Sequence, residues 1–112
     1  MSKRIQRVNA LLAREVSQLL IREMDFSPDI LVTVTRTETS GNLFESKVFI
    51  SVLPEQKSKE VFEALNKKIY FLQQKINGRL KMRPLPKIIF VPETKTIEAE
   101  EIEKALEKLK KG

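Results

Sequence analysis

A run of basic side chains with no acidic neighbour is the most informative stretch of this chain. Between Ala64 and Pro92 the sequence contains no Asp or Glu. The same stretch carries seven basic residues, Lys67, Lys68, Lys75, Arg79, Lys81, Arg83 and Lys87. Charge of one sign over so long a segment is typical of a surface that binds a polyanion, nucleic acid above all.

The rest of the composition leaves little chemistry for catalysis. The chain has no Cys and no His, which excludes disulfides, thiolate chemistry, imidazole acid–base catalysis and the usual zinc ligands. Asp25 and Asp29 lie close together, but beside Pro28 they are typical of a turn rather than of a magnesium site. We therefore expect no enzymatic activity, no cofactor, no metal and no small-molecule substrate.

Length and charge bound the organisation of the chain. A sequence of 112 residues supports one domain with a modest core. The net charge of +6 belongs to the body of the chain, because residues 93–112 hold six Glu and five Lys. We expect one domain over residues 1–92 and a charged C-terminal helix or tail over residues 93–112. Neither a secretory signal nor a membrane-spanning segment is visible, so we expect a cytoplasmic protein without membrane contact.

Helices and strands must position the basic run, and hydrophobic spacing predicts both. Apolar residues at helical spacing predict helices over residues 3–24 and 58–76, the second ending at Asn77-Gly78. β-branched and alternating residues predict strands over residues 30–39 and 44–53, joined as a hairpin. A short strand over residues 87–91 and a Glu/Lys-rich helix over residues 97–111 follow. The order α-β-β-α-β plus a C-terminal helix predicts an α+β fold, in which helices cover one face of a three-stranded sheet.

Three motifs across residues 3–91 together resemble a known family. They are Arg4-Ile-Gln-Arg-Val8 with Arg14-Glu-Val16 in the first helix, Val32-Thr-Val34 with Ser46-Lys-Val-Phe-Ile50 in the hairpin, and Leu80-Lys-Met-Arg-Pro-Leu-Pro-Lys-Ile-Ile-Phe90. In this order and spacing they resemble the ribosome-binding factor A family. The resemblance implies a type II KH-like fold without enzymatic activity. It also implies a bacterial factor that binds the free small (30S) ribosomal subunit through its 16S rRNA and assists late subunit maturation and rRNA processing.

The chain departs from this pattern in the second helical region. Family members carry a small-residue Ala-x-Gly kink there, whereas this chain has Lys68-Ile69-Tyr70. We therefore expect a straighter helix, or one that kinks elsewhere, near Asn77-Gly78.

Glycine and aromatic residues limit how RNA is read. KH domains grip single strands with a Gly-x-x-Gly loop, and the three glycines of this chain form none. We expect phosphate contacts rather than reading of base sequence, with Tyr70 at the edge of the core and Phe44, Phe49 and Phe90 inside it.

The residues expected to contact RNA form two patches, one on the first helix and one along the acid-free run. Arg79 and Arg83 are the strongest candidates, because a guanidinium can bind phosphate oxygens bidentately. Asn77 would add a hydrogen bond, and Gly78 would allow close approach of the backbone. The full set is Lys3, Arg4, Arg7, Lys67, Lys68, Lys75, Asn77, Gly78, Arg79, Lys81, Arg83 and Lys87.

Two other functions stay open at this point. A general KH-like RNA-binding module is disfavoured by the missing Gly-x-x-Gly loop. A protein–protein adaptor would use the hairpin edge or the charged C-terminal helix, with the basic face serving solubility. As an alternative to phosphate contact, Lys67 and Lys68 would pair with Glu63 and Glu60 along the helix. A monomer is expected in either case.

Overall fold

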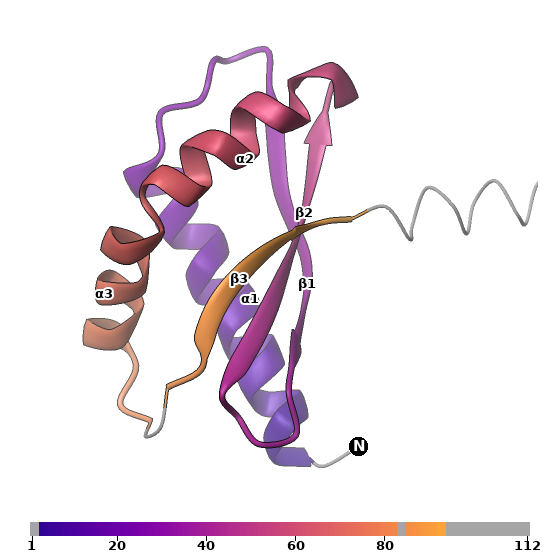
Figure 1. The fold of residues 1–112 in the computed structure, drawn as a ribbon. Coiled ribbons are helices and arrows are strands. Elements are labelled where there is room, and N and C mark those ends of the chain that lie inside the picture. Colours follow the sequence, from indigo (N-terminus) through magenta and orange to yellow (C-terminus); the bar gives the residue numbers. More distant parts are fainter. Residues whose placement is uncertain (1–2, 83–84, 94–112) are drawn as a thin grey trace, which may run out of the picture.

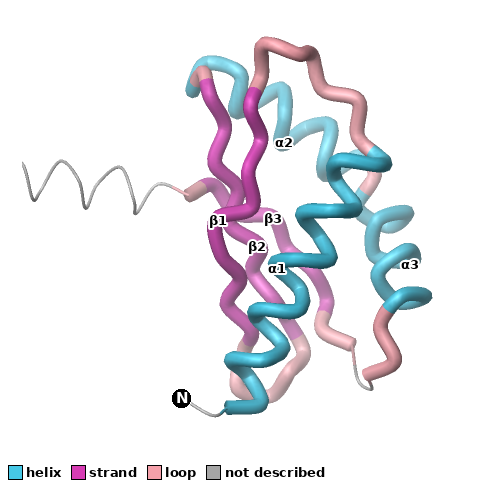
Figure 2. Tube along the Cα trace, turned by 180° about the vertical axis from the view of Figure 1, so that it is seen from behind, coloured by secondary structure: helices cyan, strands magenta, loops and turns pink. Residues whose placement is uncertain are grey.

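The computed structural model describes residues 3–82 and 85–93, which form two layers. The elements are α1 (Lys3–Glu23), β1 (Leu31–Thr39), β2 (Glu45–Leu53), a short 3-10 turn η1 (Glu55–Lys57), α2 (Ser58–Lys67), α3 (Ile69–Arg79) and β3 (Lys87–Pro92). In both overall views the helices lie on one side of the sheet (Figure 1, Figure 2). The predicted α+β fold is confirmed, with the second helix divided in two. The expected helix over residues 97–111 lies outside the described residues.

The sheet is mixed, and β2 lies at its centre. The strand order within the described residues is β1-β2-β3, with β1 antiparallel and β3 parallel to β2. The alternation read from the sequence sets the faces of β2 as predicted, since Ser46, Val48, Ile50 and Val52 are all buried. Their burial follows from the helices that cover this face.

The core forms where the apolar stripes of the helices meet that face. α1 packs against β1 and α3, and α2 packs against β2 and β3. The fully buried side chains include Leu12, Val16, Ile50, Leu65 and Leu72. Burial of each such side chain contributes about 1.5–3 kcal/mol. Ile21 on α1 is 82% exposed, although its side chain is apolar.

The second helical region bends at Lys68, which corrects our expectation of a straighter helix. Lys68 has φ −103° and ψ 10°, and its N–H bonds to the carbonyls of Asn66 and Leu65 at the end of α2. Its own carbonyl accepts from the N–H of Leu72 and starts the hydrogen bonds of α3. The bend needs no small residue, because φ at Lys68 is negative and any side chain tolerates it. It therefore falls at the start of Lys68-Ile69-Tyr70, the residues at which we expected no kink.

The prediction that the second helix kinks or ends at Asn77-Gly78 was also wrong. α3 continues through both residues to Arg79. Gly78 does not adopt a positive φ, so this helix does not end on a left-handed glycine.

Two aromatic predictions also need correction. Phe44 is 66% exposed and Tyr70 is 85% exposed, although we expected the first in the core and the second at its edge. Phe49 and Phe90 are buried as predicted. The error arises because Tyr70 belongs to the outer side of α3, one position away from the stripe that packs inward.

Phe49 faces away from the helices and is covered by a polar cluster. The guanidinium of Arg36 lies 3.8 Å from the centroid of its ring. Arg36 Nε donates to Oε2 of Glu93 at 2.8 Å, and the hydroxyl of Thr35 donates to the same oxygen at 2.7 Å. The hydrogen bond to Glu93 raises the pKa of Arg36. Glu93, which the sequence placed in a charged tail, is thus buried against β1.

The loop between α1 and β1 contains the turn that the sequence predicts. Ser27 Oγ donates to Oδ1 of Asp29, and the N–H of Ile30 donates to the carbonyl of Ser27 at 2.9 Å. The hydrogen bond from Ser27 lowers the pKa of the Asp29 carboxyl. This carboxylate therefore serves the turn.

Candidate nucleic-acid interface

The bend between α2 and α3 presents the first two basic residues of the run. The Nζ atom of Lys68 lies 3.3 Å from the carbonyl oxygen of Glu23, at the C-terminus of α1, to which it donates a hydrogen bond. Lys67 is exposed, and within residues 3–82 and 85–93 neither lysine forms an ion pair with Glu60 or Glu63. The side chain of Lys67 is thus available to a ligand, while that of Lys68 helps to hold the bend against α1.

α3 is fixed on its inner side by Gln73. The Nε2 atom of Gln73 donates to the carbonyl of Pro86 at 3.2 Å and to Oδ1 of Asn77 at 3.1 Å. Its Oε1 accepts from the N–H of Ile88 at 2.8 Å. These bonds tie α3 to the start of β3. They also engage Asn77, which we expected to contact RNA.

Lys75 lies on the outer side of the same helix. Its Nζ is 5.4 Å from the centroid of the Phe71 ring, one helical turn earlier. Gly78 follows on this side, and no atom lies within 4 Å of where its Cβ would be. A ligand backbone therefore has room to approach the helix closely at Gly78.

Arg79 has an acidic partner from another part of the chain. Its Nε donates to Oε2 of Glu15 on α1 at 2.9 Å, and its side chain is 34% exposed. Glu15 is buried, and its second oxygen lies 3.6 Å from Arg14. The run is free of acids in sequence, but in space α1 supplies one at the end of α3.

The end of the acid-free run comes close to the start of α1. Lys3, Arg4 and Arg7 line a shallow hollow of about 670 Å³ together with Val8, Leu11 and Met82. Met82 comes directly after exposed Lys81, so the basic residues of α1 lie beside the segment that follows α3. Arg83 lies outside the described residues.

Lys87 lies apart from these residues. It begins β3 opposite Glu45 in the parallel register, and the next residue, Ile88, is buried under the helices. Because side chains alternate along a strand, Lys87 points to the other face of the sheet. The structure therefore does not bring Lys87 together with the lysines of α2 and α3.

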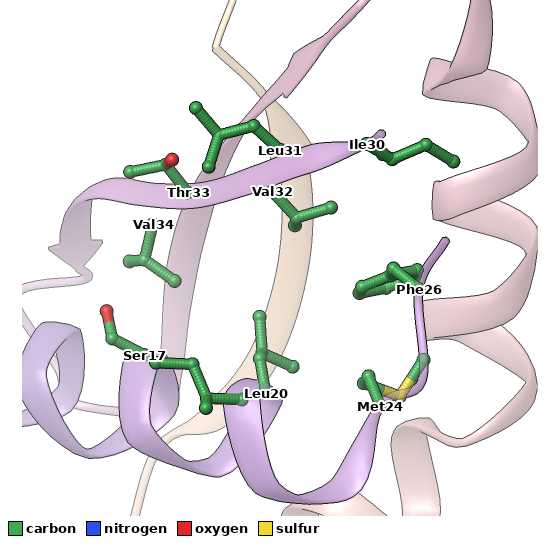
Figure 3. A pocket seen from close by; sticks show the side chains of 10 residues that line it. Ser17, Leu20, Met24, Phe26, Ile30, Leu31, Val32, Thr33 and Val34 are labelled. Atoms are coloured by element: carbon green, nitrogen blue, oxygen red, sulfur yellow. The ribbon is translucent and has the colours of Figure 1, made fainter. Parts of the chain in front are cut away.

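An apolar pocket of about 420 Å³ lies between the C-terminal half of α1 and the first half of β1. Figure 3 shows Val32 and Val34 pointing toward Leu20 and Ser17, whereas Leu31 and Thr33 point to the other side of the strand. Ser17 and Thr33 are the polar residues among those that line it. The pocket thus offers apolar contact and has no charge for phosphate.

Sequence reasoning missed three residues of this surface: Glu15, Tyr70 and Phe71. Tyr70 and Phe71 fall outside the inward stripe formed by Leu65, Ile69, Leu72 and Ile76. That spacing could have placed both on the outer side, although we expected Tyr70 at the edge of the core. No sequence signal assigns Glu15 to Arg79, because the pair is brought together only by the packing of α1 on α3.

Within the described residues, no cluster of acidic side chains is placed to hold a metal ion. In the same part of the chain, no helix combines the length and the apolarity needed to cross a bilayer.

Comparison with known proteins supports the family resemblance found in the sequence. The sequence model of the family "Ribosome-binding factor A" matches residues 4–106. A ribosome-binding factor A from Gloeothece citriformis is 32% identical over 95 residues, which cover 82% of this chain and 72% of the relative.

Two structures of ribosome-binding factor A from Thermus thermophilus share the fold. The crystal structure has a TM-score of 0.68 at 24% identity and covers 79% of this chain and 94% of its own. A homology model fitted into the cryo-EM map of a 30S complex has a TM-score of 0.62 at 24% identity, covering 76% and 90%. Because the family model spans nearly the whole sequence and α1 to β3 superpose on this fold, the chain belongs to the ribosome-binding factor A family.

Proposed function

We propose that this protein binds the free small ribosomal subunit through its 16S rRNA and assists late maturation of the subunit and rRNA processing. Membership of the ribosome-binding factor A family is the observation that carries the proposal. The protein acts by binding rather than by catalysis. We place the protein in the cytoplasm, because bacterial ribosomal subunits mature there. We also propose that it is a monomer.

The surface described above gives this binding a physical basis. Lys67 and Lys75 are exposed on consecutive helices, and Lys3, Arg4 and Arg7 lie beside Met82. Lysine and arginine side chains in such an arrangement neutralise phosphates and release counterions, which makes affinity fall as salt rises. Phosphate contacts fix the position of the protein on RNA without reading its sequence.

Differential affinity is the simplest mechanism for an assembly factor of this kind. The protein binds one arrangement of rRNA more tightly than the mature arrangement, so it stabilises the immature state and dissociates when maturation removes the matching surface. No step in this scheme requires a reactive side chain.

Co-sedimentation with purified bacterial subunits tests the proposal. The protein is mixed with free small subunits, with large subunits and with intact ribosomes, each across a series of salt concentrations. We expect binding to free small subunits alone, weakening steeply with salt. Equal binding to all three particles, or no binding at low salt, would overturn the proposal.

A further inference from the structure

Two aromatic side chains stand on the basic surface, and the mechanism above does not use them. Tyr70 is 85% exposed and Phe71 is 44% exposed, both in the first turn of α3. Unlike the single exposed ring of Phe44, these two rings are neighbours on a basic surface, where their apolar faces can stack against a planar ligand.

The fixed inner side of α3 determines where these rings point. Leu72 and Ile76 are buried, and Gln73 is bonded to Pro86 and Ile88, so the helix cannot rotate to bury Tyr70. Consecutive helical residues are about 100° apart around the axis, which spreads the two rings over the outer side. Helical side chains also lean toward the N-terminus, which brings Tyr70 over the bend at Lys68.

The charges around the rings are those that suit nucleic acid. Lys67 precedes the bend, and the Nζ of Lys75 lies 5.4 Å from the centroid of Phe71. No acidic residue occurs on α3. The nearest acid before the rings in the sequence is Glu63, one turn before Lys67 on α2. A ligand here meets the exposed ring of Tyr70 and the ring of Phe71 beside the ammonium group of Lys75.

We infer that Tyr70 and Phe71 form a stacking site for unpaired RNA bases, with Lys67 and Lys75 on the flanking phosphates. The inference rests on the proposed rRNA binding and names the part of the RNA that this surface takes. Base–aromatic stacking tolerates any sequence, because every base has a π-face. The site therefore adds affinity for single strands without the base reading that a Gly-x-x-Gly loop supports.

Duplex RNA and protein partners fit this surface less well. In an A-form helix the bases are stacked on one another, so their faces are closed to a side chain and only loops, bulges and ends can offer them. An acidic protein would satisfy the lysines but would leave the two rings without a matching planar group. The occupant to which we commit is thus a short unpaired RNA segment.

The sequence supplies its own probe for this site. Tyr70 is the single tyrosine of the chain and there is no tryptophan, so intrinsic tyrosine fluorescence reports on this residue alone. The full chain is titrated with a single-stranded RNA hexamer, with an abasic hexamer of the same charge and with a short RNA duplex. We expect quenching by the hexamer, and we expect emission to persist with the abasic strand and the duplex.

Variants separate stacking from charge. Tyr70→Leu should weaken hexamer binding, measured by anisotropy of labelled RNA, by about 5- to 100-fold with an unchanged salt slope, and Tyr70→Phe should keep most of the affinity. Phe44→Leu is the matched control, because it removes another exposed ring, one that lies outside the acid-free run, and should change nothing.

Each outcome decides the inference. Hexamer binding that survives Tyr70→Leu, equal losses in Tyr70→Leu and Phe44→Leu, or equal quenching by the duplex would overturn it. Failure of the proposed function looks different, because the wild-type protein would then fail to sediment with small subunits while hexamer quenching persisted. If instead Tyr70→Leu binds the hexamer normally and a Lys67→Gln, Lys75→Gln double variant does not, the lysines bind the RNA by charge alone and the stacking site is overturned.

Discussion

The Nε atom of Arg79 donates a hydrogen bond to Oε2 of Glu15 at 2.9 Å, which joins the last turn of α3 to α1. The sequence made Arg79 one of the two strongest candidates for binding phosphate, yet its guanidinium already has a carboxylate partner. Its contribution is therefore first to the packing of the helices. We therefore propose that phosphate binding depends mainly on Lys67, Lys75 and the basic residues of α1.

The coupling between Glu15 and Arg79 can be measured directly. In a double-mutant cycle of Glu15→Gln and Arg79→Gln, we expect a coupling of about 1 kcal/mol in the free energy of unfolding by urea. Full burial would give a larger value, but Arg79 is 34% exposed and water screens the pair. Arg14→Gln, at the longer and more exposed contact to Glu15, should show little coupling. A cycle that closes to zero would contradict the structural role of Arg79.

Removing two lysines from the helical side should lower the salt dependence of RNA binding. For Lys67→Gln with Lys75→Gln, we expect the slope of log affinity for small subunits against log salt to fall by about two units, one for each lost phosphate contact. The fold should persist, since both side chains are exposed.

Lys47→Gln with Lys87→Gln is the matched control for that pair. It removes the same charge from the opposite face of the sheet, and it should leave the slope unchanged. Equal slopes in the two double variants would show that binding reflects net charge rather than this surface. Lys87 was among the residues predicted to contact RNA, so this control also tests its separation from them.

Gln73 should be a strong determinant of stability. Gln73→Leu leaves the N–H of Ile88 without its partner, at a cost of about 1–3 kcal/mol. Gln73→Glu keeps an acceptor for that N–H but cannot donate to the carbonyl of Pro86, so its loss should be smaller. Urea denaturation measures the free energy of unfolding of both variants, and the m-value should stay unchanged. Equal stability of wild type and Gln73→Leu would rule out this role.

Glu93 should stabilise the outer face of the sheet. Glu93→Leu removes the carboxylate that accepts from Arg36 and Thr35, and we expect a loss of about 2–3 kcal/mol, below the 3–5 kcal/mol typical of fully buried pairs, because Arg36 keeps partial access to water. Glu93→Gln keeps an acceptor oxygen and should lose less. Thermal unfolding of the three proteins ranks them, and a Glu93→Leu variant as stable as wild type would contradict the expectation.

The sequence predicted the fold well because its local patterns agree with one another. Period-two alternation in residues 44–53 identified the buried face of β2, and helical spacing identified Leu12, Val16 and Leu65 as core. These signals are local, since each depends on the geometry of one element. The family motifs then placed the elements in a known order.

What the sequence could not give depends on contacts between distant residues. The partner of Arg79 lies on α1, and Glu93 meets Arg36 across the sheet, so neither pair has a spacing that a pattern can reveal. The bend at Lys68 was missed for another reason. We associated a kink with small residues, whereas this backbone bends at a negative φ that lysine accommodates.

The parallel pairing of β3 has a consequence for the order in which the parts of the protein fold. β1 and β2 can pair as soon as their hairpin has been synthesised, but β3 joins β2 only after α2 and α3 have crossed over the sheet. Gln73 finds Pro86 and Ile88 only at that stage. A nascent chain that has not yet released residues 86–93 from the ribosome therefore lacks the anchor of α3. The basic surface that α3 carries is therefore completed only when β3 joins the sheet.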